Sequence, residues 1–376
     1  MSIVFKIANI IYKILSSIIP VNNRRIIIEC DYGKGLYGNM KYIYSEIVKE
    51  KLNYQIIIPV NKGVKININD DNTKIVRTRG IKHFYYLITA RFWITNNHYY
   101  YFLEKRKETK YINTWHALGA FKKFGMDCSC DDKEMYIRDG KNIDSLLVSS
   151  KQVASIYSKA LNVDIDKIIS IGIPRTDILF DDIVKEGIRK KFCKEFGDKK
   201  VILYAPTFRD REKEKFELKL DIEKLINNVG EKYILFIKLH PIIRAKVDIP
   251  QEFKKSIFDV SEYDMNELLI YSDILITDYS SVVFEFALLE KPIIFFAYDL
   301  EEFKENSRQF YFGYEEFIPD SPVRDTNEII NKIKKYDNDE NEITLTKIKE
   351  FGEKYCEFKD GKSTQRFIRK FLYEKE

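Results

Sequence analysis

The stretch DILITDYSSVVFEFALLEKPIIFF, residues 273–296, contains the structural pattern that recurs along this chain. DILIT (273–277) and PIIFF (292–296) are continuously apolar and β-rich, which is typical of strands buried on both faces of a parallel sheet. Between them, the polar turn DYSS leads into a helical pattern over 280–290. A strand, a helix and a second strand in this order predict a βαβ unit.

The same alternation extends outward from this stretch in both directions. Helical patterns over 38–50, 150–161, 219–228 and 264–271 separate further β-rich runs. Two such series, divided by the charged helical stretch 181–198, predict an α/β fold of two doubly wound domains, with the charged helix from Glu342 closing the second. The further predicted strands are RIIIEC (25–30), YQIIIPV (54–60), FWITN (92–96), YINTW (111–115), SLLVS (145–149), IISI (168–171), VILYA (201–205), YILFIKL (233–239) and IFDV (257–260).

Length and composition agree with a two-domain globular protein. The chain has 376 residues and a mass of 44.7 kDa, with 45% hydrophobic and 32% charged residues, which excludes a disordered chain. The formal net charge of +5 is too small to indicate a nucleic-acid partner. The longest stretch without a charged residue is twelve residues, 92–103, whereas a membrane-spanning helix needs about 20 apolar residues.

The cysteines do not form a disulfide framework, because five in so long a chain are too few. Cys128 and Cys130 form a C-x-C pair in an acidic stretch without a nearby histidine. Two incidental thiols are the preferred interpretation, and a metal site is the weaker alternative. We therefore expect a reduced, cytosolic protein with no metal.

The first twenty residues predict an amphipathic helix that ends at Pro20. Polar residues at Ser2, Lys6, Asn9, Lys13 and Ser16 are spaced by three or four and form one narrow stripe on a helix. The lysines interrupt the apolar run, so a secretory signal is not indicated. Two interpretations remain: a helix that lies in a membrane surface, and a helix buried against its own domain.

Two of the four histidines follow predicted buried strands. His116 comes directly after YINTW, and His240 comes directly after YILFIKL. The carboxyl ends of strands form the ligand crevice in doubly wound sheets, so these positions favour a functional role over loop capping. His83 and His98 lie among aromatic residues and are interpreted as structural.

Polar residues also follow two strands of the second series. VILYA runs into Thr207 and Arg209, and DILIT runs into Asp278, Ser280 and Ser281. The two serines suit the N-terminus of the next helix, whose N–H groups can bind phosphate, although plain capping explains them equally well. With Arg209, they predict a cradle for a pyrophosphate group.

Other nucleotide and catalytic motifs are missing from the sequence. The glycines after the first predicted strand do not have the G-x-G-x-x-G spacing, and there is no Walker lysine loop or G-x-S-x-G. No cofactor and no tightly held metal are therefore expected. The loop IGIPRTD (171–177) adds another candidate, Arg175, after a predicted strand.

Seven segments resemble, in order, the motifs of the CDP-glycerol glycerophosphotransferases, which build the poly(polyol phosphate) chains of wall teichoic acid. The resemblance covers about residues 110–370. The segments are NTWHALGAFKKFG (113–125), SIGIPRTDILF (170–180), VILYAPTFRD (201–210), KLHP (238–241), LLIYSDILITDYSSVVFEFALLEKPIIFFAYDLEEF (268–303), RQFYFGYEE (308–316) and DGKSTQR (360–366).

This resemblance implies the GT-B architecture, in which two Rossmann-like domains face a central cleft. Taken with the amphipathic pattern of the first twenty residues, it divides the chain into a membrane-associating helix over 1–20, an acceptor domain over 21–183 and a CDP-alcohol-binding domain over 184–376. His116 and His240 match the catalytic histidines of the family, and the second also binds the donor. The donor-binding set would be Arg209, Thr207, Asp278, Ser280, Ser281 and Arg175.

The resemblance further implies the reaction and its partners. Glycerol phosphate or ribitol phosphate would pass from a CDP-alcohol to an undecaprenyl-diphosphate-linked acceptor, with release of CMP, at the cytoplasmic face of a bacterial membrane. Ala117, where glycine is commoner, and Glu285, where aspartate is commoner, leave open both the polyol and the step, primer transfer or polymerisation. A GT-B glycosyltransferase, a nucleotide-sugar epimerase and a non-enzymatic membrane scaffold are the alternatives.

Overall fold

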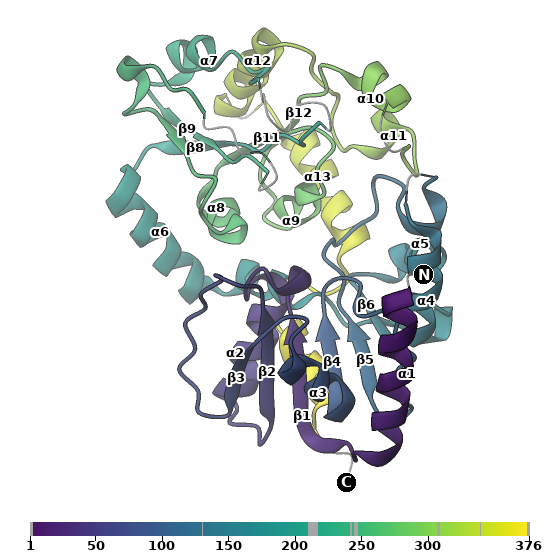
Figure 1. Ribbon diagram of the computed structural model, residues 1–376. Helices are drawn as coiled ribbons and strands as arrows, with labels where there is room; N and C mark the ends of the chain where they lie inside the picture. The colour runs from purple at the N-terminus through teal and green to yellow at the C-terminus, as the bar shows by residue number, and fades with distance from the viewer. Residues whose placement is uncertain are drawn as a thin grey trace. The chain divides into compact units, whose positions relative to one another are not determined.

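The computed structural model describes residues 3–129, 131–209, 217–240, 243, 247–306, 309–338 and 340–373. The chain forms two compact units (Figure 1). The first consists of Met1–Leu118, Phe124–Asp177 and Asp360–Glu376, and the second consists of Gly119–Lys123 and Ile178–Lys359. Each unit therefore receives one short segment from the part of the chain that mainly builds the other.

A seven-stranded parallel sheet forms the centre of the first unit, with strand order β3-β2-β1-β4-β5-β6-β7. The order of the first five strands is that of a Rossmann fold. The strands are β1 (Asn22–Glu29), β2 (Gln55–Val60), β3 (Thr73–Arg77), β4 (Ala90–Thr95), β5 (Lys110–Asn113), β6 (Ser145–Val148) and β7 (Ile168–Ser170). The helices are α1 (Ile3–Ile18), α2 (Gly38–Lys49), α3 (Ile81–Thr89), α4 (Lys133–Asn142), α5 (Lys151–Leu161) and α14 (Ser363–Phe371).

The second unit repeats this plan with a five-stranded parallel sheet of order β10-β9-β8-β11-β12. Its strands are β8 (Lys200–Tyr204), β9 (Tyr233–Ile237), β10 (Ile257–Asp259), β11 (Ile274–Thr277) and β12 (Ile293–Phe295). Its helices are α6 (Asp182–Phe196), α7 (Ile222–Val229), α8 (Met265–Tyr271), α9 (Val282–Ala287), α10 (Leu300–Asn306), α11 (Tyr314–Phe317), α12 (Thr326–Asp337) and α13 (Glu342–Tyr355).

The predicted α/β fold with two doubly wound sheets is confirmed, and each predicted strand is present. β3 was not predicted. It lies at the edge of its sheet and pairs only with β2, and Val76 is its one buried residue. An edge strand that buries so little apolar surface has no continuous apolar run in its sequence.

Helix α9 is shorter than the pattern over 280–290 suggested, because it covers only Val282–Ala287. The residue at its N-cap, Ser281, makes no side-chain capping bond, and the Ser280 hydroxyl instead accepts a 3.4 Å bond from the N–H of Val282. After the helix, Glu290 has a left-handed φ of 55° and turns the chain toward β12.

The C-terminal stretch contains two helices that belong to different units. Helix α13 packs against α9 in the second unit, whereas α14 packs against α2 in the first. The N–H groups of Ser363 and Thr364 donate to the carboxylate of Asp177 at 2.9 and 2.7 Å. This carboxylate satisfies two N–H groups that helix geometry leaves open at the start of α14. Only the first part of the stretch from Glu342 thus packs on the second unit.

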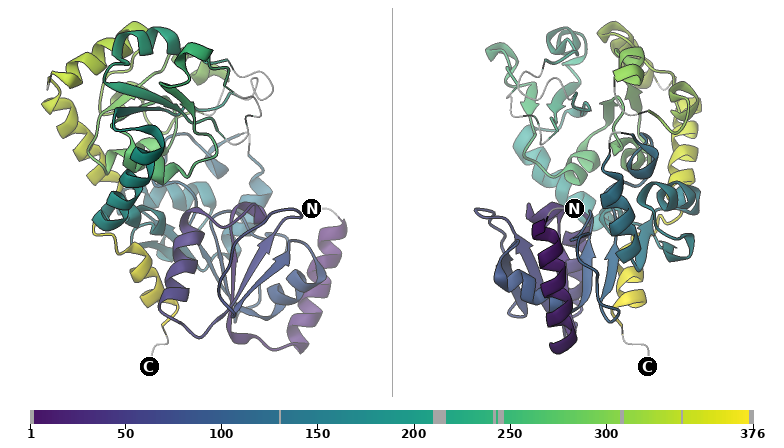
Figure 2. Two further views of the ribbon diagram at one scale, coloured as in Figure 1. Left: turned by 90° about the vertical axis from the view of Figure 1, so that its left-hand side faces the viewer. Right: turned by 45° about the vertical axis from the view of Figure 1, so that its right-hand side comes forward.

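Helix α1 turns most of its polar stripe toward its own unit and its apolar side outward, while Lys6 is exposed. Asn9 exchanges two hydrogen bonds with Glu104, and Lys13 pairs with the same carboxylate at 2.5 Å. Tyr12 is fully buried against Phe84 and Trp93. The purple helix in Figures 1 and 2 shows its course beside the sheet of this unit. Its exposed apolar residues are Ile3, Val4, Ile7, Ile10, Ile11, Ile14 and Ile18, which expose between 44% and 74% of their surface.

Candidate active site

His116, the candidate base of the first unit, directly follows a strained turn at the end of β5. Trp115 has a left-handed φ of 49°, which is unfavourable for a bulky side chain. Its N–H donates to the side-chain oxygen of Asn113 at 2.8 Å, and this bond helps to hold the turn. The turn ends the strand directly before His116.

Two residues that are distant in sequence support this turn. The amide of Asn39, in the first turn of α2, donates to the carbonyl of Trp115 and to the hydroxyl of Thr114, both at 3.1 Å. The Asn39 side-chain oxygen accepts the N–H of Arg175 at 3.1 Å. The Arg175 guanidinium in turn donates to the carbonyl of His116 at 2.7 Å. A network of hydrogen bonds from the side chains of Asn39 and Arg175 thus sets the backbone beside His116.

The environment of His116 keeps its imidazole neutral. Its Nδ1 lies 3.3 Å from the carbonyl of Asn96, which can only accept, so Nδ1 carries the proton and Nε2 is the basic nitrogen. The side chain is exposed, yet the surrounding protein desolvates it and lowers the pKa to about 4. The bond to Asn96 raises the pKa, and the charge of Arg175 lowers it further.

Two other histidines of this unit are part of the core. His98 Nδ1 donates to the carboxylate of Asp139 at 2.7 Å, and the ring packs against Trp115 and Tyr136. His83 is fully buried beside Tyr99, and burial lowers its pKa to about 3. Both agree with the structural role that their aromatic surroundings indicated.

In the second unit, the predicted residues come together at the ends of β8 and β11. These neighbouring strands mark the point where the strand order reverses, which is where doubly wound sheets bind ligands. The N–H of Thr207 donates to Asp278 at 2.8 Å, and Arg209 forms an ion pair with the same carboxylate at 2.9 Å. Among the described residues, the Thr207 hydroxyl is buried without a hydrogen-bond partner, whereas Asp278 Oδ2 has the ion pair with Arg209 as its contact.

Asp299, which lies beyond β12, was not among the residues predicted from the sequence. Its carboxylate accepts two hydrogen bonds from Arg209, at 2.8 and 2.9 Å, and a third from the hydroxyl of Tyr279 at 2.9 Å. The stretch AYDLEEF (297–303) is part of the segment 268–303 that resembles the family motifs, but nothing in its spacing indicated a partner for Arg209.

His240 is exposed at the end of the segment that follows β9, and its ring lies 4.6 Å from that of Phe208. Two residues earlier, Lys238 is buried and donates to the backbone carbonyls of Ser261 and Tyr263. Burial lowers the pKa of this lysine. The lysine of the K-L-H-P segment thus fixes the backbone that carries His240, while Pro241 lies outside the described residues.

The predicted set is therefore divided between the units. Thr207, Arg209 and Asp278 make direct contacts with one another in the second unit, and Ser280 follows in the same loop. Arg175, which we expected on the donor side, contacts His116 in the first unit. Its role in donor binding stays a prediction, as do the roles of the other residues.

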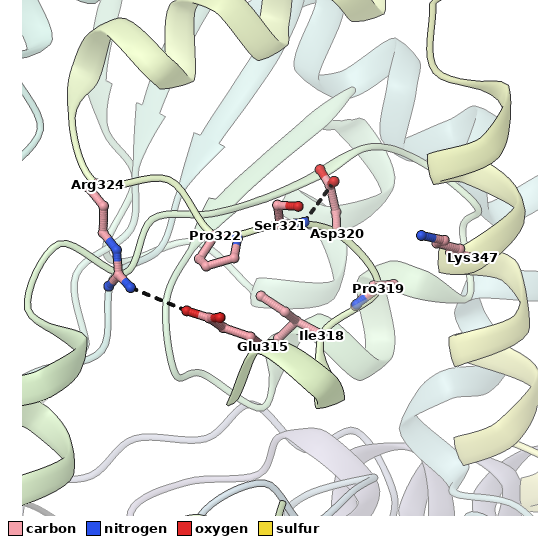
Figure 3. A pocket seen from close by; sticks show the side chains of 8 residues that line it. All are labelled: Glu315, Ile318, Pro319, Asp320, Ser321, Pro322, Arg324 and Lys347. Carbon is pink, nitrogen blue, oxygen red and sulfur yellow. Dashed lines mark hydrogen bonds and ion pairs between the residues drawn. The ribbon is translucent and has the colours of Figure 1, made fainter. Parts of the chain in front are cut away.

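An open pocket of about 400 Å³ in the second unit contains none of the predicted residues. Figure 3 shows that Arg324 and Glu315 face each other across it, 3.5 Å apart. Asp320, also in its lining, pairs with Lys332 of α12. The charges around this pocket are largely balanced within the protein, so they do not indicate an anion site. Its lining consists of Glu315, Ile318, Pro319, Asp320, Ser321, Pro322, Arg324 and Lys347.

Neither a metal centre nor a membrane span is found in the described part of the chain. Those residues contain no group of three or more His, Cys, Asp or Glu side chains arranged to hold a metal ion. Nor do they contain a helix that combines the length and the hydropathy needed to cross a bilayer. Cys130, half of the C-x-C pair, lies outside the described residues.

Comparison with known families matches nearly the whole chain. The sequence model described as CDP-Glycerol:Poly(glycerophosphate) glycerophosphotransferase covers residues 11–373. The teichoic acid poly(glycerol phosphate) polymerase of Bacillus spizizenii is 31% identical, over 99% of this chain and 97% of the relative. The teichoic acid glycerol-phosphate primase of Bacillus subtilis is 36% identical, over 77% and 75%. A poly(ribitol-phosphate) polymerase of B. spizizenii is 30% identical, and this chain spans 58% of its length.

Solved structures show the same relationship. The wall teichoic acid polymerase TagF superimposes with a TM-score of 0.86 at 27% identity, over 98% of this chain and 94% of the other. This neighbour supports the predicted GT-B architecture. A UDP-N-acetylglucosamine 2-epimerase superimposes with a TM-score of 0.54 at 12% identity, over 95% and 98%, and shares the fold alone.

Proposed function

The chain belongs to the CDP-glycerol:poly(glycerophosphate) glycerophosphotransferase family, and from this premise we propose that it transfers a polyol phosphate from a CDP-alcohol to a lipid-linked teichoic acid acceptor. The acceptor is the linkage unit or the growing polymer, and CMP is released. The family match favours this phosphotransferase over the glycosyltransferase, epimerase and scaffold alternatives, since the epimerase likeness is limited to the fold.

In the proposed reaction, His116 is the general base. The acceptor hydroxyl attacks the phosphorus that bears the polyol, and its proton passes to Nε2 of His116. The new P–O bond forms as the bond from that phosphorus to CMP breaks, so CMP leaves with the electron pair. One observation supports this role most strongly: Nδ1 is committed to the carbonyl of Asn96, and the ring is exposed and neutral.

The donor is proposed to bind at the strand ends of the second unit. His240, Ser280, Ser281 and Thr207 are proposed to contact the CDP-alcohol. The buried Thr207 hydroxyl has hydrogen-bonding capacity that no described residue fills, which supports a ligand contact at this point. Transfer of this kind depends on positioning and charge stabilisation more than on covalent chemistry by the protein.

The polyol and the step remain part of the proposal, because relatives that use glycerol phosphate and ribitol phosphate both match the chain. Purified protein would be incubated with CDP-glycerol or CDP-ribitol and a lipid-linked disaccharide acceptor, with or without one glycerol phosphate already attached. Product masses then identify the donor and the acceptor. His116→Ala is the control for enzyme-catalysed transfer. If neither CDP-alcohol gives CMP with any acceptor, the proposed function is wrong.

We further propose that the protein is peripheral at the cytoplasmic face of the membrane, held there by α1. The outward apolar side of this helix supports an interfacial position over the buried alternative. A lipid-linked acceptor would require the active site to work close to a membrane surface. Lys6 adds a basic residue on the same helix, which favours anionic lipid.

A further inference from the structure

The guanidinium of Arg209 connects the three loops that follow β8, β11 and β12. Its Nε and Nη2 donate to the two carboxylate oxygens of Asp299, at 2.8 and 2.9 Å. Nη1 donates to the backbone carbonyl of Thr207 at 2.6 Å, and Nη2 forms the ion pair with Asp278. A bidentate contact of this kind holds the plane of the guanidinium in one orientation.

Aromatic rings enclose the same group. The guanidinium carbon lies 5.1 Å from the ring centre of Tyr279, 5.5 Å from that of Tyr298 and 4.9 Å from that of Phe303. Only 12% of the Arg209 side chain and 14% of the Asp299 side chain are exposed. The charge pairs are therefore largely shielded from water. Such contacts are stronger in this shielded environment than at an exposed surface.

The charges of this cluster argue against direct capture of a phosphate. One guanidinium is balanced by two carboxylates, Asp278 and Asp299, so the cluster carries a net charge of about −1 when both are ionised. A diphosphate would gain little from approaching it, and it would have to displace a carboxylate to reach the N–H groups. The cluster instead fixes the backbone around Asp278, because the Thr207 N–H and the Tyr279 N–H both donate to that carboxylate.

We infer that Asp299 is a positioning residue for donor binding, because it holds the guanidinium of Arg209 in place. Arg209 then acts as a brace: it fixes the backbone of the loop Asp278–Ser281 and does not itself bind the diphosphate. This inference rests on the proposed function for the identity of the donor. It assigns Arg209 an indirect part in the donor site, whereas the sequence predicted a direct one.

The substitution Asp299→Asn separates the two possibilities by the sign of its effect. It removes one negative charge and weakens the hold on Arg209. If Arg209 bound the diphosphate directly, the freed guanidinium would bind CDP-glycerol or CDP-ribitol as well as before, or better. If Arg209 is a brace, the loop loosens and donor affinity falls by about tenfold to a hundredfold.

Calorimetric titration of the wild type, Asp299→Asn, Arg209→Gln and the double variant with each CDP-alcohol tests this. We expect both single variants to lose donor affinity by similar factors, the double variant to be no weaker than the weaker single one, and the acceptor KM to stay unchanged. Unchanged or tighter binding by Asp299→Asn would overturn the inference. Wild-type protein that binds neither CDP-alcohol contradicts the proposed function.

A second measurement does not depend on the ligand. Amide hydrogen exchange of residues 279–282 should accelerate in Asp299→Asn, while exchange in α12 stays at the wild-type rate. Glu315→Gln is the matched control, because it removes the carboxylate of an exposed arginine pair in the same unit (Figure 3). It should change neither donor affinity nor exchange. Loop exchange in Asp299→Asn that equals the wild type refutes the brace, whichever ligand the protein binds.

Discussion

The guanidinium of Arg175 donates a 2.7 Å hydrogen bond to the backbone carbonyl of His116. Desolvation by the surrounding protein is the main cause that lowers the pKa of the imidazole, and the positive charge of Arg175 lowers it further. Arg175 thus acts on the proposed base in two ways. It fixes the backbone that carries the ring, and it disfavours the protonated form that cannot accept a proton.

Replacing Arg175 by Gln should shift the pH dependence of transfer. Without the positive charge, the pKa of His116 rises from its value of about 4, so more of the enzyme is protonated at mildly acid pH. The acid limb of the kcat profile should therefore move to higher pH. Arg138→Gln, which breaks an exposed pair with Glu134 in the same unit, is the control and should leave the profile in place. An unmoved acid limb in Arg175→Gln would count against this electrostatic role.

Replacing His240 by Ala should weaken donor binding. The ring lies at a strand end beside Phe208 and is proposed to contact the CDP-alcohol. Loss of one charge-assisted contact costs about 1.5–3 kcal/mol, or a tenfold to hundredfold rise in the donor dissociation constant. Titration with CDP-glycerol measures this, with thermal unfolding as the control for folding. A variant with normal donor affinity but much lower kcat would instead assign His240 to the chemical step.

Two substitutions on α1, Ile7→Asn and Ile14→Asn together, should reduce binding to anionic vesicles without unfolding the protein. Both side chains are exposed, so their loss removes apolar contact with lipid and no core packing. Ile343→Asn, at an even more exposed isoleucine of α13, is the control in a sedimentation assay. This test is cleaner than deleting residues 2–19, because deletion would also remove the fully buried Tyr12. Vesicle binding that survives both substitutions would exclude α1 as the membrane contact.

Glu29→Gln should stabilise the protein at alkaline pH. Burial raises the pKa of this carboxyl to about 8 in the folded state, above its ordinary value of 4.5. Between these values the folded state binds more protons than the unfolded state, so wild-type stability falls as pH rises. The difference in the free energy of unfolding between variant and wild type should grow by up to about 1.4 kcal/mol per pH unit between these two pKa values. Denaturant unfolding at pH 5, 6.5 and 8 measures this difference. A difference in the free energy of unfolding that does not depend on pH would contradict the raised pKa of Glu29.

Gly119→Ala should destabilise the second unit. A methyl group at this position would lie 2.3 Å from the ring of Phe284, which is almost fully buried and cannot easily move aside. Overpacking of this kind typically costs about 1–3 kcal/mol. Chemical denaturation measures the loss. Gly187→Ala, where the added carbon meets nothing within 4 Å, is the matched control and should not lose stability. Equal stability of the two variants would show that Phe284 can repack.

The sequence by itself determined the two parallel sheets and the positions of the main candidate residues. Continuous apolar runs such as VILYA and DILIT are stable only when both faces of the strand are buried, which requires helices on either side. Once such a strand is predicted, the residues at its carboxyl end can be read directly from the sequence. His116, Thr207, Asp278 and His240 could therefore be identified before the structure was known.

Only the tertiary structure decided which distant residues meet. Arg209 and Asp299 are 90 positions apart, and Asn39 and Arg175 are 136 apart. Periodicity describes which face of one element is buried, but it does not say which loop of another element covers that face. Helix α1 is a second example. The spacing of its polar residues predicted a stripe, but only the packing of Tyr12 in the structure shows which side of the helix faces the protein.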